Sequence, residues 1–128
     1  MAKWLEEDWF KVVWETWLDC FEDNNLEYDF IITNPPFNWN KKFLKRAIEL
    51  QKPFAFLQRL EHLWWVEACE IFKDRHIQII IPEKRINYII PKMMQWEKVW
   101  WSQFHSIWIT YGLNLTQDIL YVKELCKK

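Results

Sequence analysis

The sequence predicts an α/β fold in which one acidic helix precedes a mostly parallel sheet with an antiparallel C-terminal strand pair. Short β-branched and aromatic runs alternate with segments of helical period, the pattern of a parallel sheet with crossover helices. Two prolines end the first such run, as expected where a buried strand leads into a rigid turn. The 128 residues suffice for one domain, in which we expect residues 1–25 to form the helix and 26–128 the sheet region.

The N-terminal region is strongly acidic. Residues 1–29 hold nine acidic residues against two lysines, a net charge of −7, whereas residues 30–128 carry +6. Apolar residues recur at intervals of three and four between about Trp4 and Glu22, which predicts an amphipathic helix. Asn24 and Asn25 can adopt the left-handed conformation that ends it.

The remaining elements follow from hydrophobic period and turn residues. The expected strands are Tyr28–Thr33, Pro53–Leu57, His76–Ile81, Phe104–Tyr111 and Ile119–Glu124. The expected helices are about Lys41–Gln51, with Asn38 or Asn40 as its cap, and Glu61–Lys73. We expect the last two strands to pair with each other through the turn that begins at Gly112.

Composition excludes several function classes. Gly112 is the single glycine, so no glycine-rich phosphate or dinucleotide loop can form. No apolar run approaches the roughly 20 residues of a membrane span, and the acidic start does not resemble a signal peptide.

Cysteine and histidine usage points to a cytoplasmic protein without a metal. Cys20, Cys69 and Cys126 are odd in number and widely spaced, which favours reduced thiols that pack as small buried hydrophobes. The three histidines show no zinc-ligand spacing, so we predict no metal.

One tetrapeptide carries chemistry. Asn34-Pro35-Pro36-Phe37 follows the first predicted strand, and ligands of open α/β sheets bind at the carboxyl ends of strands. The Asn34 side-chain carbonyl and the proline-held backbone carbonyl can each accept a hydrogen from the exocyclic amine of a flipped adenine, which frees the nitrogen lone pair to attack a methyl donor. The Phe37 ring can stack on the base.

The sequence resembles the amino-methyltransferases, whose motif (D/N/S)-P-P-(Y/F/W) follows a hydrophobic strand, and it looks closest to phage-type adenine-N6 DNA methyltransferases. The resemblance covers roughly residues 27–124. Its further segments are Lys52-Pro53-Phe54-Ala55, Ile80-Ile81-Pro82, Lys84-Arg85-Ile86-Asn87 and the run from Phe104 to Asn114. It implies a Rossmann-like methyltransferase sheet, here truncated to the catalytic half, with Asn34, Pro35, Pro36 and Phe37 as catalytic residues.

The resemblance also implies S-adenosylmethionine as the cofactor. The family holds it with a glycine-containing loop after its first strand, and no such segment precedes or follows the tetrapeptide. We therefore expect this chain alone to bind the cofactor weakly or not at all, and a complementing chain to supply that half.

DNA, or RNA, is the expected partner. The basic residues that could hold phosphates are Lys41, Lys42, Lys45, Arg46, Lys84 and Arg85, although such residues can equally form a solvated surface. Eleven tryptophans are too many to bury in a domain this small, so we expect several to be exposed or shared with a partner, in a homo-oligomer or with the complementing chain. Met93–Trp101 is expected to be a packed helix or partner surface rather than a base-reading platform.

Two functions remain open at this point. The first is an adenine-N6 methyltransferase-like protein that is inactive without its complement. The second is a catalytically inactive, methyltransferase-derived module that binds nucleic acid or a protein through its tryptophan-rich surfaces and acidic first helix. Against any relation to methyltransferases, the Asn-Pro-Pro sequence can be merely a strand-terminating turn.

Overall fold

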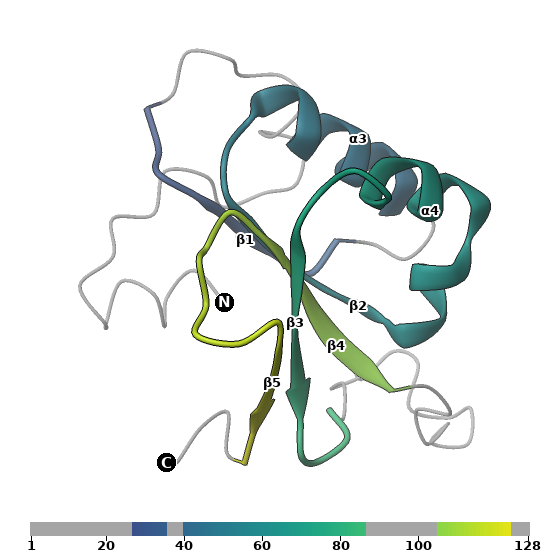
Figure 1. The fold of residues 1–128 in the computed structure, drawn as a ribbon, viewed down its shortest axis with the longest axis vertical. Helices are drawn as coiled ribbons and strands as arrows, with labels where there is room; N and C mark the ends of the chain where they lie inside the picture. The colour runs from purple at the N-terminus through teal and green to yellow at the C-terminus, as the bar shows by residue number, and fades with distance from the viewer. Residues whose placement is uncertain (1–26, 36–39, 87–104, 124–128) are drawn as a thin grey trace, which may run out of the picture.

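The structure is a computed structural model that describes residues 27–35, 40–86 and 105–123. These residues form a five-stranded sheet of order β1-β2-β4-β3-β5 with helices along one side (Figure 1). The strands are β1 (Ile31–Thr33), β2 (Phe54–Arg59), β3 (Ile77–Pro82), β4 (Ser106–Tyr111) and β5 (Ile119–Val122). The helices are α3 (Asn40–Leu50), the 3₁₀ helix η2 (Leu60–Trp64) and α4 (Val66–Phe72). The predicted acidic helix and Met93–Trp101 lie outside the described residues.

The predicted α/β class is confirmed, and the predicted parallel character is matched in part. β1 pairs parallel with β2, and β3 pairs parallel with β5. β4 lies between β2 and β3 and is antiparallel to both. Four strands therefore run in one direction, and the fifth is inserted between them in the opposite direction.

The predicted pairing of the last two strands is wrong. β4 and β5 run in opposite directions, but β3 lies between them. Burial explains the difference, because four of the six β4 residues are buried, as in a central strand, whereas β5 alternates between exposed and half-buried residues, as at an edge. The seven connecting residues, 112–118, also exceed the two to five of an ordinary hairpin loop.

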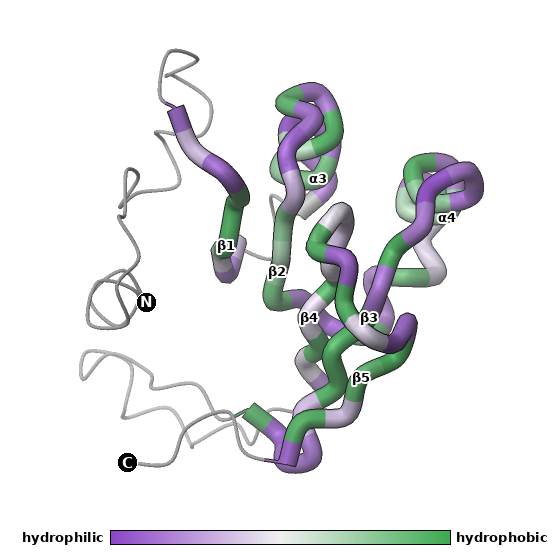
Figure 2. Tube along the Cα trace, turned by 60° about the vertical axis from the view of Figure 1, so that its left-hand side comes forward, coloured by the Kyte–Doolittle hydropathy of each residue, from purple (hydrophilic) through white to green (hydrophobic). Residues whose placement is uncertain are grey.

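The hydrophobic core lies between α3 and the β1-β2 pair. Phe43, Leu44 and Ala47 form the buried side of α3, as its period predicted, and contact Phe54 and Phe56 of β2. The two phenylalanine rings stack with centroids 4.7 Å apart. Figure 2 shows the resulting alternation of hydrophobic and hydrophilic residues along α3.

The predicted helix Glu61–Lys73 is divided in two. Trp65 is extended, with φ −71° and ψ 146°, and separates η2 from α4. This break rotates the apolar face, so that Val66 is 71% exposed while Ala68 is buried. Cys69, expected to be buried, is a free, exposed thiol for the same reason.

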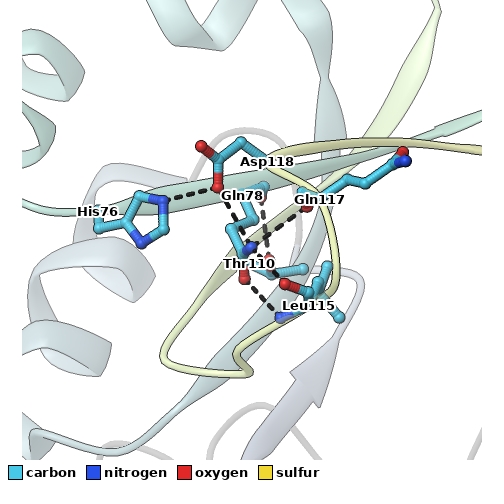
Figure 3. Close-up of polar contacts among 6 residues, drawn as sticks. All are labelled: His76, Gln78, Thr110, Leu115, Gln117 and Asp118. Carbon is cyan, nitrogen blue, oxygen red and sulfur yellow. Dashed lines mark hydrogen bonds and ion pairs between the residues drawn. The ribbon is translucent and has the colours of Figure 1, made fainter.

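A buried glutamine attaches the β4–β5 loop to the sheet. The Gln78 amide of β3 accepts a hydrogen bond from the Leu115 backbone N–H (2.7 Å) and donates to the backbone oxygens of Leu115 (3.0 Å) and Gln117 (3.2 Å). Asp118 adds a contact to His76 at 2.7 Å (Figure 3). This network holds the loop across the start of β3 and places β5 at the outer edge.

No helix within the described ranges is both long and apolar enough to cross a membrane.

Candidate functional site

The carboxyl ends of β1, β2 and β3 lie at one edge of the sheet, which we call the carboxyl edge. Asn34 and Pro35 leave β1 at this edge, as predicted, and the last β1 residue, Thr33, pairs with Phe56 of β2. The Asn34 side chain is exposed, and Pro35 is almost completely buried. Pro36 and Phe37 lie outside the described residues. The described half of the tetrapeptide thus combines an accessible amide with an anchored proline.

The predicted basic residues reach the same edge in two groups. Lys41, Lys42 and Lys45 are exposed on α3, which begins just after the tetrapeptide. In the same helix Arg46 is half-buried, with Nη1 3.4 Å from Glu49 Oε2.

The second basic group follows β3. Lys84 and Arg85 are exposed there, and Arg85 Nη2 lies 3.4 Å from His105 Nε2. Because β1 and β3 are separated by two strands, they lie about 14 Å apart across the sheet at the usual spacing between strands. The structure therefore brings both groups to one edge without bringing them into a single cluster.

A pocket opens beside this edge, between α3, the end of β2 and α4, and we call it the Trp65 pocket. Its volume is about 300 Å³ including the open mouth. It is lined by Lys41, Leu44, Gln58, His62, Trp65, Glu67, Ala68, Ile71 and Phe72.

Gln58 is the lining residue of this pocket whose hydrogen bonding is unusual. Its side chain is 3% exposed, and its Nε2 has no hydrogen-bond partner among the described residues. A buried amide without a partner costs about 1–3 kcal/mol, so such groups are rare in folded proteins. Gln58 therefore supplies an unused hydrogen-bond donor to the pocket.

Two rings form another wall. The His62 ring is 4.1 Å from the Trp65 ring, centroid to centroid, and His62 is buried. Burial and, to a lesser extent, the positive charge of Arg59 lower the pKa of His62, whereas Glu61 opposes this shift. The imidazole is consequently neutral at pH 7.

An ion pair lies at the mouth. Lys41 Nζ is 2.5 Å from Glu67 Oε1 and 5.3 Å from the centre of the Trp65 ring. The hydrogen bond from Lys41 lowers the pKa of the Glu67 carboxyl. Both side chains are about half exposed, so water screens their attraction.

Sequence reasoning missed this pocket. Gln58 is a polar residue at the end of the run Phe54–Leu57, which is apolar at every position, as in a strand buried on both faces, and this was a usable signal. His62 and Trp65 are three residues apart, a spacing that would put both side chains on one side of a continuous helix. What could not be predicted is the extended backbone at Trp65 that turns its ring toward the pocket.

Comparison of the chain with protein-family models, curated proteins and solved structures finds no match. Within the described residues, no three His, Cys, Asp or Glu side chains are grouped as a metal site would require.

Proposed function

We propose that this chain is the catalytic half of an adenine-N6 DNA methyltransferase-like protein with a truncated Rossmann-like sheet. In this proposal the Asn34-Pro35-Pro36-Phe37 segment binds the base, the basic residues of the carboxyl edge bind phosphates, and a complementing half binds the cofactor.

The observation that carries the proposal is the position of Asn34 and Pro35 at the carboxyl edge. This is where ligands of open α/β sheets bind. Three segments of the family resemblance also fall on successive neighbours in this sheet. Lys52-Pro53-Phe54-Ala55 enters β2, Ile80-Ile81-Pro82 ends β3, and the late aromatic run forms β4.

The chemistry assigned to the chain's own residues is orientation. The exposed Asn34 carbonyl oxygen accepts one amine hydrogen, and the backbone carbonyl of Pro35 accepts the other. The proline ring fixes φ of Pro35, and the burial of Pro35 anchors the turn beside the exposed Asn34 amide before the base arrives.

The described residues do not fit S-adenosylmethionine. When bound, this cofactor supplies the methyl group, and its family holds it with a glycine loop at the carboxyl edge. Gly112 has φ 71° and packs against Pro53, at the opposite edge of the sheet. The donor site therefore has to come from a complementing half, and we expect the isolated chain not to methylate DNA.

The experiment that tests the base site compares two oligonucleotides, one of which lacks the exocyclic amine of a single adenine. Two single-stranded oligonucleotides differ only at one position, which is adenine in one and purine, which lacks the exocyclic amine, in the other. Two hydrogen bonds at about 0.5–1.5 kcal/mol each predict roughly tenfold tighter binding of the adenine strand. Asn34→Ala should reduce that preference severalfold. Equal binding of both strands by the unmodified chain contradicts the proposal.

A second function is favoured by the absence of a glycine loop from the sequence. A methyltransferase-derived module that binds nucleic acid or a protein needs no donor site. It would bind the adenine and purine strands equally, or neither of them, and Asn34→Ala would change nothing. The same titration therefore separates the two functions.

A further inference from the structure

We propose that the Trp65 pocket binds one nucleotide of a single-stranded nucleic acid, with the base stacked on Trp65, a base acceptor atom on Gln58 Nε2 and the phosphate on Lys41. The choice of a nucleotide rests on the proposed function. The existence of a ligand site rests on the pocket itself.

The buried end of the pocket is built to donate a hydrogen bond. Gln58 Nε2 is buried without a partner among the described residues, and it belongs to the pocket wall. The neighbouring imidazole of His62 is held neutral by its burial. A neutral ligand with a carbonyl oxygen or ring nitrogen at its inner end satisfies Gln58 without placing a charge in an apolar surrounding.

The mouth suits a flat ring that carries an anionic group. Trp65 is half-buried, so part of its side chain reaches solvent at the mouth, and a tryptophan ring is a good partner for a flat base. Lys41 lies over that ring, 5.3 Å from its centre, and its partner Glu67 is half exposed. A phosphate can therefore displace the Glu67 carboxylate from Lys41 at little cost.

The enclosed part of the pocket limits how much of a ligand can enter it. The 300 Å³ of empty space includes the open mouth. The enclosed part is narrow, with room for about one water-sized group. One acceptor atom of a base fits there while the ring of the base remains on Trp65.

The test follows the Trp65 indole N–H and the Gln58 side-chain amide by NMR while the full chain is titrated with adenosine 5′-monophosphate. Both signals should shift together and saturate. Trp65→Leu should weaken binding about five- to a hundredfold, the usual loss when a stacking ring is removed. Trp64→Leu is the matched control, because Trp64 is 71% exposed and is not part of the pocket wall.

Variants of the polar residues show separately how the base and the phosphate of the nucleotide contribute to binding. Gln58→Met should weaken binding of both adenosine and its monophosphate about two- to tenfold, the loss of one hydrogen bond. Lys41→Gln should weaken only the monophosphate, whereas Glu67→Gln should strengthen it. Lys123→Gln is the control for Lys41, since Lys123 is exposed just after β5, at the far edge of the sheet, and is not in the pocket.

Two results would overturn the inference. One is the absence of a saturating shift at Trp65 and Gln58 up to millimolar nucleotide, which leaves the pocket a water site only. The other is equal weakening by Trp64→Leu and Trp65→Leu. Neither result depends on Asn34. The proposed base site at the tetrapeptide is therefore tested separately, by the preference of the chain for the adenine strand over the purine strand.

Discussion

Replacing Gln78 with methionine should detach the β4–β5 loop without unfolding the sheet. Gln78 is 5% exposed, and its amide makes two short hydrogen bonds to the Leu115 backbone, at 2.7 and 3.0 Å. A net contribution of about 1 kcal/mol for each gives a loss of about 2 kcal/mol. The longer contacts to Gln117 and Asp118 are weaker, and methionine fills a similar volume, so the loss should not be much larger.

Urea unfolding of the two proteins measures this loss, and amide hydrogen exchange locates it. The Ile79 N–H, which donates to the Asp118 backbone oxygen at 2.7 Å, should exchange faster in Gln78→Met. The exchange rates of the amides between β2 and β4 should change only as much as the loss of global stability requires. Gln117→Met is the control, because that side chain is exposed and should change stability by less than about 0.5 kcal/mol. A Gln78→Met protein as stable as the Gln117→Met control would refute the assigned role of the amide.

Three further changes test the packing around the proposed sites. Gln58→Met should raise the free energy of unfolding by about 1 kcal/mol in urea titrations, because it removes a buried amide that has no partner among the described residues; a loss of stability would mean that the amide is satisfied in the folded chain. His62 has a lowered pKa, so the unfolded state binds more protons below pH 6.5 and stability should fall as pH falls through that range. His62→Asn should flatten this fall in melting temperature, and the exposed His105→Asn should not; equal slopes would count against the burial of His62. Gly112→Ala should cost about 1–2 kcal/mol in thermal unfolding, because φ is 71° and the new Cβ would lie 3.3 Å from Pro53 Cβ; an unchanged melting temperature would show that the turn can relax.

The sequence predicted the parallel core well because its signals are local. Apolar period placed α3 within one residue of its observed start, β-branched runs located β1 and β3, and the apolar run Phe54–Leu57 located β2. Pro35 marked the end of β1 because a proline without an N–H cannot extend a parallel ladder. These features depend on residues that are close in sequence.

The order of the last strands could not be predicted from local signals. A turn that begins at Gly112 suggests a hairpin, but Gln78 draws residues 115–118 past β3, and this contact joins residues about forty apart in sequence. The break at Trp65 is similar, because no local signal marks the extended residue between the two helical segments that bury His62 and Ala68. The tetrapeptide could be chosen as a candidate site from the chemistry of four adjacent residues. The Trp65 pocket could not, because it forms only where α3, β2 and α4 come together in the fold.

The most direct test of the base site observes the amine itself. An oligonucleotide with ¹⁵N in the exocyclic amine of one adenine is titrated with the chain, and the two amine protons are followed by NMR. If Asn34 and the Pro35 carbonyl accept these protons, both should move downfield and exchange more slowly with water on binding. Asn34→Ala should return one of them to its free position and leave the other shifted. Amine protons that keep their free shifts when the protein has bound the strand would contradict the account.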